Sequence, residues 1–157
     1  MSFQLNPIGA VHAGESGYFI ELEPEYKEGL KGLEGFGYVQ ILWCFDGCDS
    51  AASRSRLLEK KPYTKGPEVL GVFATRSPER PNPIGLTSCY VTDLDCENGR
   101  LWLAWIDAND GTPVLDIKPY TPAADRVEHP AVPDWCAHWP ASEEKSGDFD
   151  WSAEFNF

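Results

Sequence analysis

The segment LTSCYVTDLDCENGRLWLAWI, residues 86–106, says most about the architecture of this chain. Apolar and polar residues alternate in 86–94 and again in 100–106, as they do in strands that bury one face. The dipeptide Asn98-Gly99 lies between the two runs, and it is typical of the tight turn that joins antiparallel strands. The segment therefore predicts a β-hairpin.

The rest of the chain is also poor in helical periodicity. Further strands are expected at 8–11, 18–22, 38–45, 68–74 and 114–119, with 38–45 buried on both faces because it is an almost continuous apolar run. Short helices are expected only at 24–35 and 51–60. Edge strands leave backbone N–H and C=O groups unpaired, and closing a sheet into a barrel pairs them. We therefore expect a mainly β fold: a small antiparallel, closed or nearly closed β-barrel with one or two short helices.

The 157 residues are enough for one domain with its own core. We expect that domain over 1–140 and an acidic tail over 141–157, either weakly ordered or docked on a partner. No apolar run reaches the roughly 18 residues of a membrane span, and the first residues lack the pattern of a secretory signal. These features predict a cytoplasmic protein without membrane contact.

The five cysteines cannot all pair with one another, so reduced thiols are expected. Cys44 and Cys48 are four residues apart, and Cys136 is followed by His138 after one residue. Structural zinc sites more often use the tighter C-x-x-C spacing. The sequence therefore predicts no metal.

The net charge of −12, from 13 basic and 25 acidic residues, disfavours binding of a polyanion. Residues 54–80, however, carry seven basic and three acidic side chains. This stretch either produces a local positive field or is simply a solvated, flexible loop. If the chain binds RNA, the candidate contacts are Lys60, Lys61 and Lys65.

The segment GVFATRSPERPNPIGL, residues 71–86, is too rich in proline for a helix or an interior strand. Its rigid loop projects Arg76 and Arg80, and guanidinium groups on a rigid backbone suit a carboxylate or a phosphate. Asn82 lies between two prolines, which hold its amide in one orientation. The alternative is a structural corner whose arginines form surface salt bridges.

The segment DANDGTPVLDIKPY, residues 107–120, gathers Asp107, Asp110 and Asp116 around a Gly-Thr-Pro turn. Such carboxylates can bind an amino group or a ribose diol, or accept a proton, although Asp and Gly are also common in ordinary turns. Neither G-x-G-x-x-G nor G-x-x-x-x-G-K-[ST] occurs in the chain. A doubly wound nucleotide-binding fold is therefore not expected.

Two motifs, ATRSPERPNPIGLT and DGTPVLDIKPYTP, resemble the TsaA-like, or TrmO, family of S-adenosylmethionine-binding β-barrel methyltransferases. PIGAV and LEPEYKEGLKGLEGF follow the order of that family, and the resemblance covers roughly residues 5 to 130. It implies a homodimeric barrel that uses S-adenosyl-L-methionine. It also implies a tRNA substrate, N6-threonylcarbamoyladenosine beside the anticodon.

The resemblance also implies a site. Arg76 and the backbone around Leu86 would contact the cofactor, and Asp107 to Pro113 would form a second wall. The cofactor-binding candidates are thus Phe45, Asp46, Arg76, Arg80, Asn82, Leu86, Asp107, Asp110, Gly111, Thr112 and Pro113, with Asp110 and Asp46 as catalytic candidates.

Two departures from the family pattern stand out. Phe45-Asp46 matches a Phe-His pair of the family, so a normally anionic group replaces one that can be neutral near pH 7. A Pro-Arg-Gln cofactor-binding element of many members is absent, because a short turn follows Val11. The alternatives to a tRNA methyltransferase are a small-molecule methyltransferase and a ligand-binding module without turnover.

Overall fold

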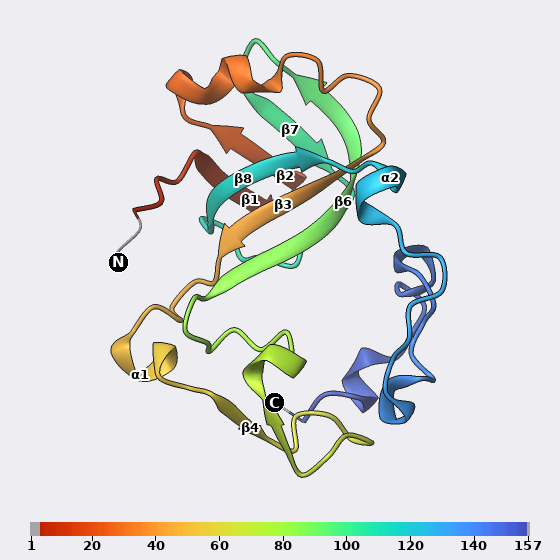
Figure 1. Cartoon of the computed structure of the whole chain (residues 1–157). Helices are drawn as coiled ribbons and strands as arrows, with labels where there is room; N and C mark the ends of the chain where they lie inside the picture. The colour runs from red at the N-terminus through yellow and green to blue at the C-terminus, as the bar shows by residue number, and fades with distance from the viewer. Residues whose placement is uncertain (1–3, 157) are drawn as a thin grey trace.

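The computed structural model describes residues 4–156, and six antiparallel strands close into a barrel (Figure 1). The order around the barrel is β1-β2-β7-β6-β3-β8, with β8 pairing back to β1. The strands are β1 (Gly9–Gly14), β2 (Gly17–Leu22), β3 (Tyr38–Cys44), β6 (Ile84–Asp95), β7 (Arg100–Leu103) and β8 (Pro113–Pro119). The predicted closed β-barrel is confirmed.

The hairpin predicted around Asn98-Gly99 joins β6 and β7. Residues 96–99 form the turn, and Gly99 takes a φ of +70°, which a side chain would disfavour. The first part of β6 pairs with β3 and its last part pairs with β7, with an irregular register between Val91 and Asp93. One long strand thus serves two neighbours and helps to bend the sheet into a barrel.

The barrel interior is apolar. Val11, Ile20, Ile41, Leu101 and Val114 have no exposed surface. Burial alternates along β3, however, because its inward side chains are buried and its outward ones are only half-buried. The expectation that this strand is buried on both faces was therefore wrong: its outer face borders a hollow.

A two-stranded sheet of β4 (Leu58–Lys60) and β5 (Val69–Gly71) lies apart from the barrel (Figure 1). The helix expected over 51–60 stops at Arg54 as α1 (Ala51–Arg54), and the strand expected over 68–74 turns into the 3-10 helix η2 (Val72–Ala74). Both expectations were wrong in extent. Residues 58–60 leave the helical conformation because they pair with β5, and β5 ends at Gly71, where this pairing ends.

The remaining elements are η1 (Pro24–Leu30), α2 (Pro122–Asp125), η3 (Asp134–Cys136), η4 (Glu143–Lys145) and η5 (Trp151–Ala153). No helix among residues 4–156 has both the length and the apolar character needed to cross a bilayer.

The C-terminal segment leaves the barrel at α2 and returns to the β4–β5 region (Figure 1). Tyr63 stacks on Trp135, with ring centres 5.2 Å apart, and also contacts Trp139 and Phe155. The backbone amide of Thr64 donates to the carbonyl of Glu154 at 2.9 Å. This aromatic cluster spans both sides of residue 140, and the domain boundary placed there stays a prediction.

Glu154 is the buried polar group of this cluster, with 6% of its surface exposed. Its carboxylate lies 2.6 Å from Nε2 of His138 and accepts a hydrogen bond from Nε1 of Trp139 at 3.1 Å. The hydrogen bond with His138, followed by that from Trp139, holds the pKa of Glu154 below its ordinary value.

We expect acid to loosen the docking of the C-terminal segment. Because the pKa of Glu154 is lowered by folding, its stabilising contribution is present above the ordinary value of 4.5 and is lost as the pH falls through the lower folded value. Tryptophan fluorescence should therefore change in acid in the wild type. That transition should be reduced in Glu154→Gln and retained in Glu128→Gln, which alters an exposed carboxylate.

Candidate functional site

Two neighbouring hollows share a border. The smaller one, of about 530 Å³, lies where the β1–β2 turn, the end of β3 and the loop after β7 meet. The larger one, of about 900 Å³, lies between the outer face of β3 and β6 and the segments 120–128 and 141–146. Trp105 and Asp107 line both. The two hollows therefore border one another at these two residues.

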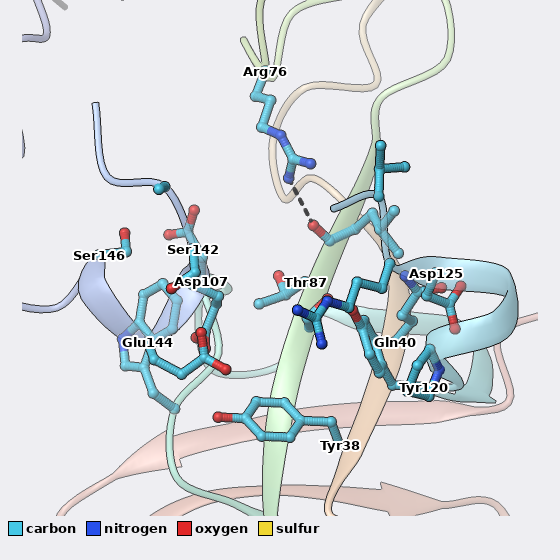
Figure 2. Close-up of a pocket in the computed structure, with 18 of the residues that line it drawn as sticks. Tyr38, Gln40, Arg76, Thr87, Asp107, Tyr120, Asp125, Ser142, Glu144 and Ser146 are labelled. Carbon is cyan, nitrogen blue, oxygen red and sulfur yellow. Dashed lines mark hydrogen bonds between the residues drawn. The ribbon is translucent and has the colours of Figure 1, made fainter. Parts of the chain in front are cut away.

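Arg76 projects into the larger hollow from the proline-rich loop. Its Nη1 donates to the carbonyl oxygen of Leu86 at 3.1 Å, which orients the guanidinium (Figure 2). No other side-chain hydrogen bond or ion pair of Arg76 occurs in the described part of the chain. Its remaining N–H groups are therefore available to an anionic ligand.

Arg80, four residues later, has a different environment. Its guanidinium donates to the backbone carbonyls of Ser77, Val72 and Thr75, at 2.8, 2.5 and 2.6 Å. The side chain thus fastens the loop to η2. Its geometry supports a positioning role, because the donors on Nε and Nη2 already have acceptors.

Tyr63 connects this loop to the C-terminal aromatic cluster. Burial raises the pKa of Tyr63, while a hydrogen bond from the backbone of Arg76 and the positive charge of its side chain lower it. The same ring stacks on Trp135. The C-terminal segment therefore supports the loop that carries Arg76.

The loop after β7 supplies the other wall. Oδ1 of Asp110 accepts a hydrogen bond from the backbone amide of Ala13 at 3.0 Å, which ties this loop to the β1–β2 hairpin. Thr112 is 1% exposed, and its Oγ1 has no hydrogen-bond partner within residues 4–156. A buried hydroxyl without a partner costs free energy, and a ligand in the smaller hollow can satisfy it.

Negative charge dominates the larger hollow. Five carboxylates line it together with two arginines: Asp107, Asp125, Glu128, Glu143 and Glu144, with Arg76 and Arg126. Burial, followed by the carboxylates of Glu143 and Glu144, raises the pKa of Tyr38 on the floor of this hollow. The hollow favours a ligand with a cationic part over a polyanion.

The two hollows bring together most of the residues expected from the sequence. Those lining them are Phe45, Asp46, Arg76, Leu86, Asp107, Asp110 and Thr112. Arg80, Asn82, Gly111 and Pro113 line neither hollow, and their contact with a cofactor stays a prediction. Among residues 4–156, no cluster of three or more His, Cys, Asp or Glu side chains could hold a metal ion.

Sequence reasoning missed Trp105, Tyr38 and Gln40 as lining residues. Trp105 was expected inside the strand over 100–106, but β7 ends at Leu103, so that expectation was wrong in extent and Trp105 lies in the loop that follows. Tyr38 and Gln40 had no signal in the sequence, because only closure of the barrel shows which face of β3 borders the hollow.

Known proteins resemble this chain in sequence and in fold. The family model described as the tRNA-methyltransferase O N-terminal domain matches residues 3–126. An S-adenosyl-L-methionine-binding protein of Archaeoglobus fulgidus is 44% identical over 108 residues, which are 69% of this chain and 72% of the relative. A tRNA (adenine(37)-N6)-methyltransferase of Eikenella corrodens is 40% identical over 110 residues, or 69% of this chain and 61% of that protein.

A crystal structure of TrmO from Pseudomonas aeruginosa has the same fold, with a TM-score of 0.63 and 34% sequence identity. The similarity covers 83% of this chain and 62% of that chain. This chain thus spans about three fifths of the two bacterial proteins. The family match over most of the chain, and the barrel shared with TrmO, show that the chain belongs to the tRNA-methyltransferase O family.

Proposed function

We propose that this protein is an S-adenosylmethionine-dependent methyltransferase that methylates N6 of adenosine 37 in tRNA. The proposal rests on the placement of two loops. Arg76 lines the larger hollow, the loop from Asp107 to Thr112 lines the smaller one, and the two hollows share Trp105 and Asp107. The names of the relatives from Archaeoglobus fulgidus and Eikenella corrodens support the cofactor and the substrate. N6-threonylcarbamoyladenosine as the acceptor form, and a homodimer as the assembly, belong to the same proposal.

The residues present fit S-adenosylmethionine. The hollows are in the size range of cofactor sites. Arg76 has free N–H groups for the carboxylate, the acidic lining suits the ammonium and sulfonium charges, and the unpaired hydroxyl of Thr112 suits a polar group of the ligand. Both hollows form in this chain, which has no Pro-Arg-Gln tripeptide.

The bound cofactor supplies a methyl group already activated on sulfonium. The protein must align the acceptor nitrogen with that methyl group and remove one proton from the nitrogen as the N–C bond forms and the S–C bond breaks. Asp110 and Asp46 both line the smaller hollow, and either carboxylate can take this proton. Asp110 is the better oriented of the two, because Ala13 holds its Oδ1.

The test is methyl transfer by the purified protein from isotope-labelled S-adenosylmethionine to tRNA that contains threonylcarbamoyladenosine, with unmodified tRNA in parallel. Mass spectrometry of the nucleosides should show a labelled methyl on the adenine N6. Cofactor binding without labelled tRNA nucleoside would contradict the proposal. It would favour a small-molecule acceptor, the second candidate, which the negative charge of the larger hollow supports.

The acidic hollow implies that phosphate contacts lie elsewhere. Lys60 and Lys65 are exposed in the β4–β5 region, and no hydrogen bond or ion pair of either side chain occurs within 4–156. Lys61 is different, because its Nζ donates to the carbonyl of Gly66 at 2.8 Å and pairs with Glu68. Lys60 and Lys65 are thus the better candidates for RNA contact.

We therefore expect Lys60→Glu with Lys65→Glu to weaken tRNA binding and to flatten its dependence on salt. Each lost phosphate contact should reduce the log-log slope by about 0.9 on duplex regions. Affinity for S-adenosylmethionine should stay unchanged. The control is Lys31→Glu with Lys118→Glu, which changes the net charge equally at positions outside both hollows. Equal loss of tRNA affinity in both double variants would exclude a specific role for the β4–β5 lysines.

A further inference from the structure

Trp105 is an indole without an internal partner. The chain has six tryptophans, and five of them pack against another aromatic ring: Trp43, Trp102, Trp135, Trp139 and Trp151. Trp105 is 49% exposed and makes no ring contact and no hydrogen bond within the described residues. A buried or half-buried indole usually finds such partners, so this side chain is free to receive a ligand.

The backbone nevertheless holds Trp105 in place. It follows β7, whose Leu101 and Leu103 point into the barrel, and it precedes Ile106, which is 2% exposed. The amide of Ala104 donates to the carbonyl of Tyr90 at 2.9 Å, which ties the neighbouring residue to β6. The indole is thus presented from a fixed segment, and little ordering of the backbone would accompany ligand binding.

The position of Trp105 is shared by the two hollows. One contains Arg76 and the other contains Asp46 and Asp110. A nucleotide that occupies both hollows would contact the indole, and a planar base is the part of a nucleotide that stacks on an aromatic side chain.

We propose that Trp105 is the stacking platform for a purine ring, and that this ring is the acceptor adenine. This inference rests on the proposed function. The acceptor is favoured over the adenine of the cofactor because Trp105 lines the smaller hollow together with Asp46 and Asp110, the carboxylates proposed to take the proton from N6. Arg76 and the acidic lining of the larger hollow are assigned to the methionine part of the cofactor. Stacking holds the adenine plane, so that N6 faces the methyl donor. Trp105 is therefore a positioning residue.

The test compares Trp105→Ala, Trp105→Phe and Phe73→Ala with the wild type. Phe73 is a matched control, because it is 83% exposed and lines neither hollow. In Trp105→Ala the KM for tRNA should rise roughly tenfold to hundredfold. In Trp105→Phe it should stay close to the wild-type value, because phenylalanine also stacks on a base. The dissociation constant for S-adenosylmethionine, from calorimetry, should be unchanged in all three variants.

A second readout does not require turnover. Adenosine should quench the tryptophan fluorescence of the wild type, and the quenching should disappear in Trp105→Phe. A loss of S-adenosylmethionine affinity in Trp105→Ala, with unchanged KM for tRNA, would identify the stacked purine as that of the cofactor and overturn the acceptor assignment. Unchanged quenching, affinity and KM would overturn the stacking role altogether. A wild type that is quenched by adenosine but methylates no tRNA would contradict the proposed function alone.

Discussion

Replacing Gly9 with alanine is expected to lower the free energy of unfolding by roughly 3 kcal/mol, the upper part of the range for overpacking a tight interior. A Cβ atom at this position would lie 2.2 Å from the carbonyl oxygen of Glu21 and 2.9 Å from Cα of Leu22. Both are backbone atoms, so no side-chain rotation relieves the clash. Gly9 also pairs with Val114 on β8, where the barrel closes.

Urea unfolding of Gly9→Ala and Gly14→Ala measures this effect. Gly14 ends the same strand, and a Cβ there would meet no atom within 4 Å, so that variant should change stability little. The comparison separates the close approach of β1 and β2 from any general effect of alanine on the strand. Similar, small changes in both variants would show that the barrel relaxes around position 9.

Arg80→Ala should destabilise the fold by about 3 kcal/mol or more, because it removes a charged donor from three backbone carbonyls. The loss should also weaken S-adenosylmethionine binding, although Arg80 lines neither hollow. The reason is that Arg80 holds the loop from which Arg76 projects. Arg80→Lys should rescue little, because a lysine ammonium cannot reproduce the planar set of donors.

Arg76→Ala is the matched comparison. Its side chain makes one hydrogen bond, to the carbonyl of Leu86, so the melting temperature should change little while S-adenosylmethionine affinity falls roughly tenfold or more. Thermal unfolding and calorimetry on both variants test the pair. If Arg80→Ala kept full stability and lost only cofactor affinity, Arg80 would contact the ligand directly. If Arg76→Ala kept its affinity, Arg76 would not belong to the site.

Local patterns were most informative where one short segment sets the backbone. Alternation on either side of Asn98-Gly99 predicted the β6–β7 hairpin, and its glycine takes the positive φ that the turn requires. The Arg76 loop could be located from its prolines alone, because proline restricts the backbone without help from the rest of the fold.

The same patterns failed where contacts between residues distant in the sequence decide the local structure. Residues 51–60 have a helical composition, yet Leu58 to Lys60 pair with Val69 to Gly71. The acidic tail shows no periodicity, yet Glu154 is buried against His138 and Trp139. In both cases the interacting residues are well separated in the sequence, so local propensity does not reveal the contact.

The sequence alone determined the strand-rich class, the hairpin and the identity of the two loops that carry Arg76 and Asp110, because these depend on neighbouring residues. Only the tertiary structure decided which charged groups are available at the site. It engaged Arg80 with three carbonyls, left Arg76 with free donors, and placed Trp105 on the border of both hollows. Two arginines four residues apart look equivalent in a sequence, but a side chain's role depends on which acceptors the folded backbone brings within its reach.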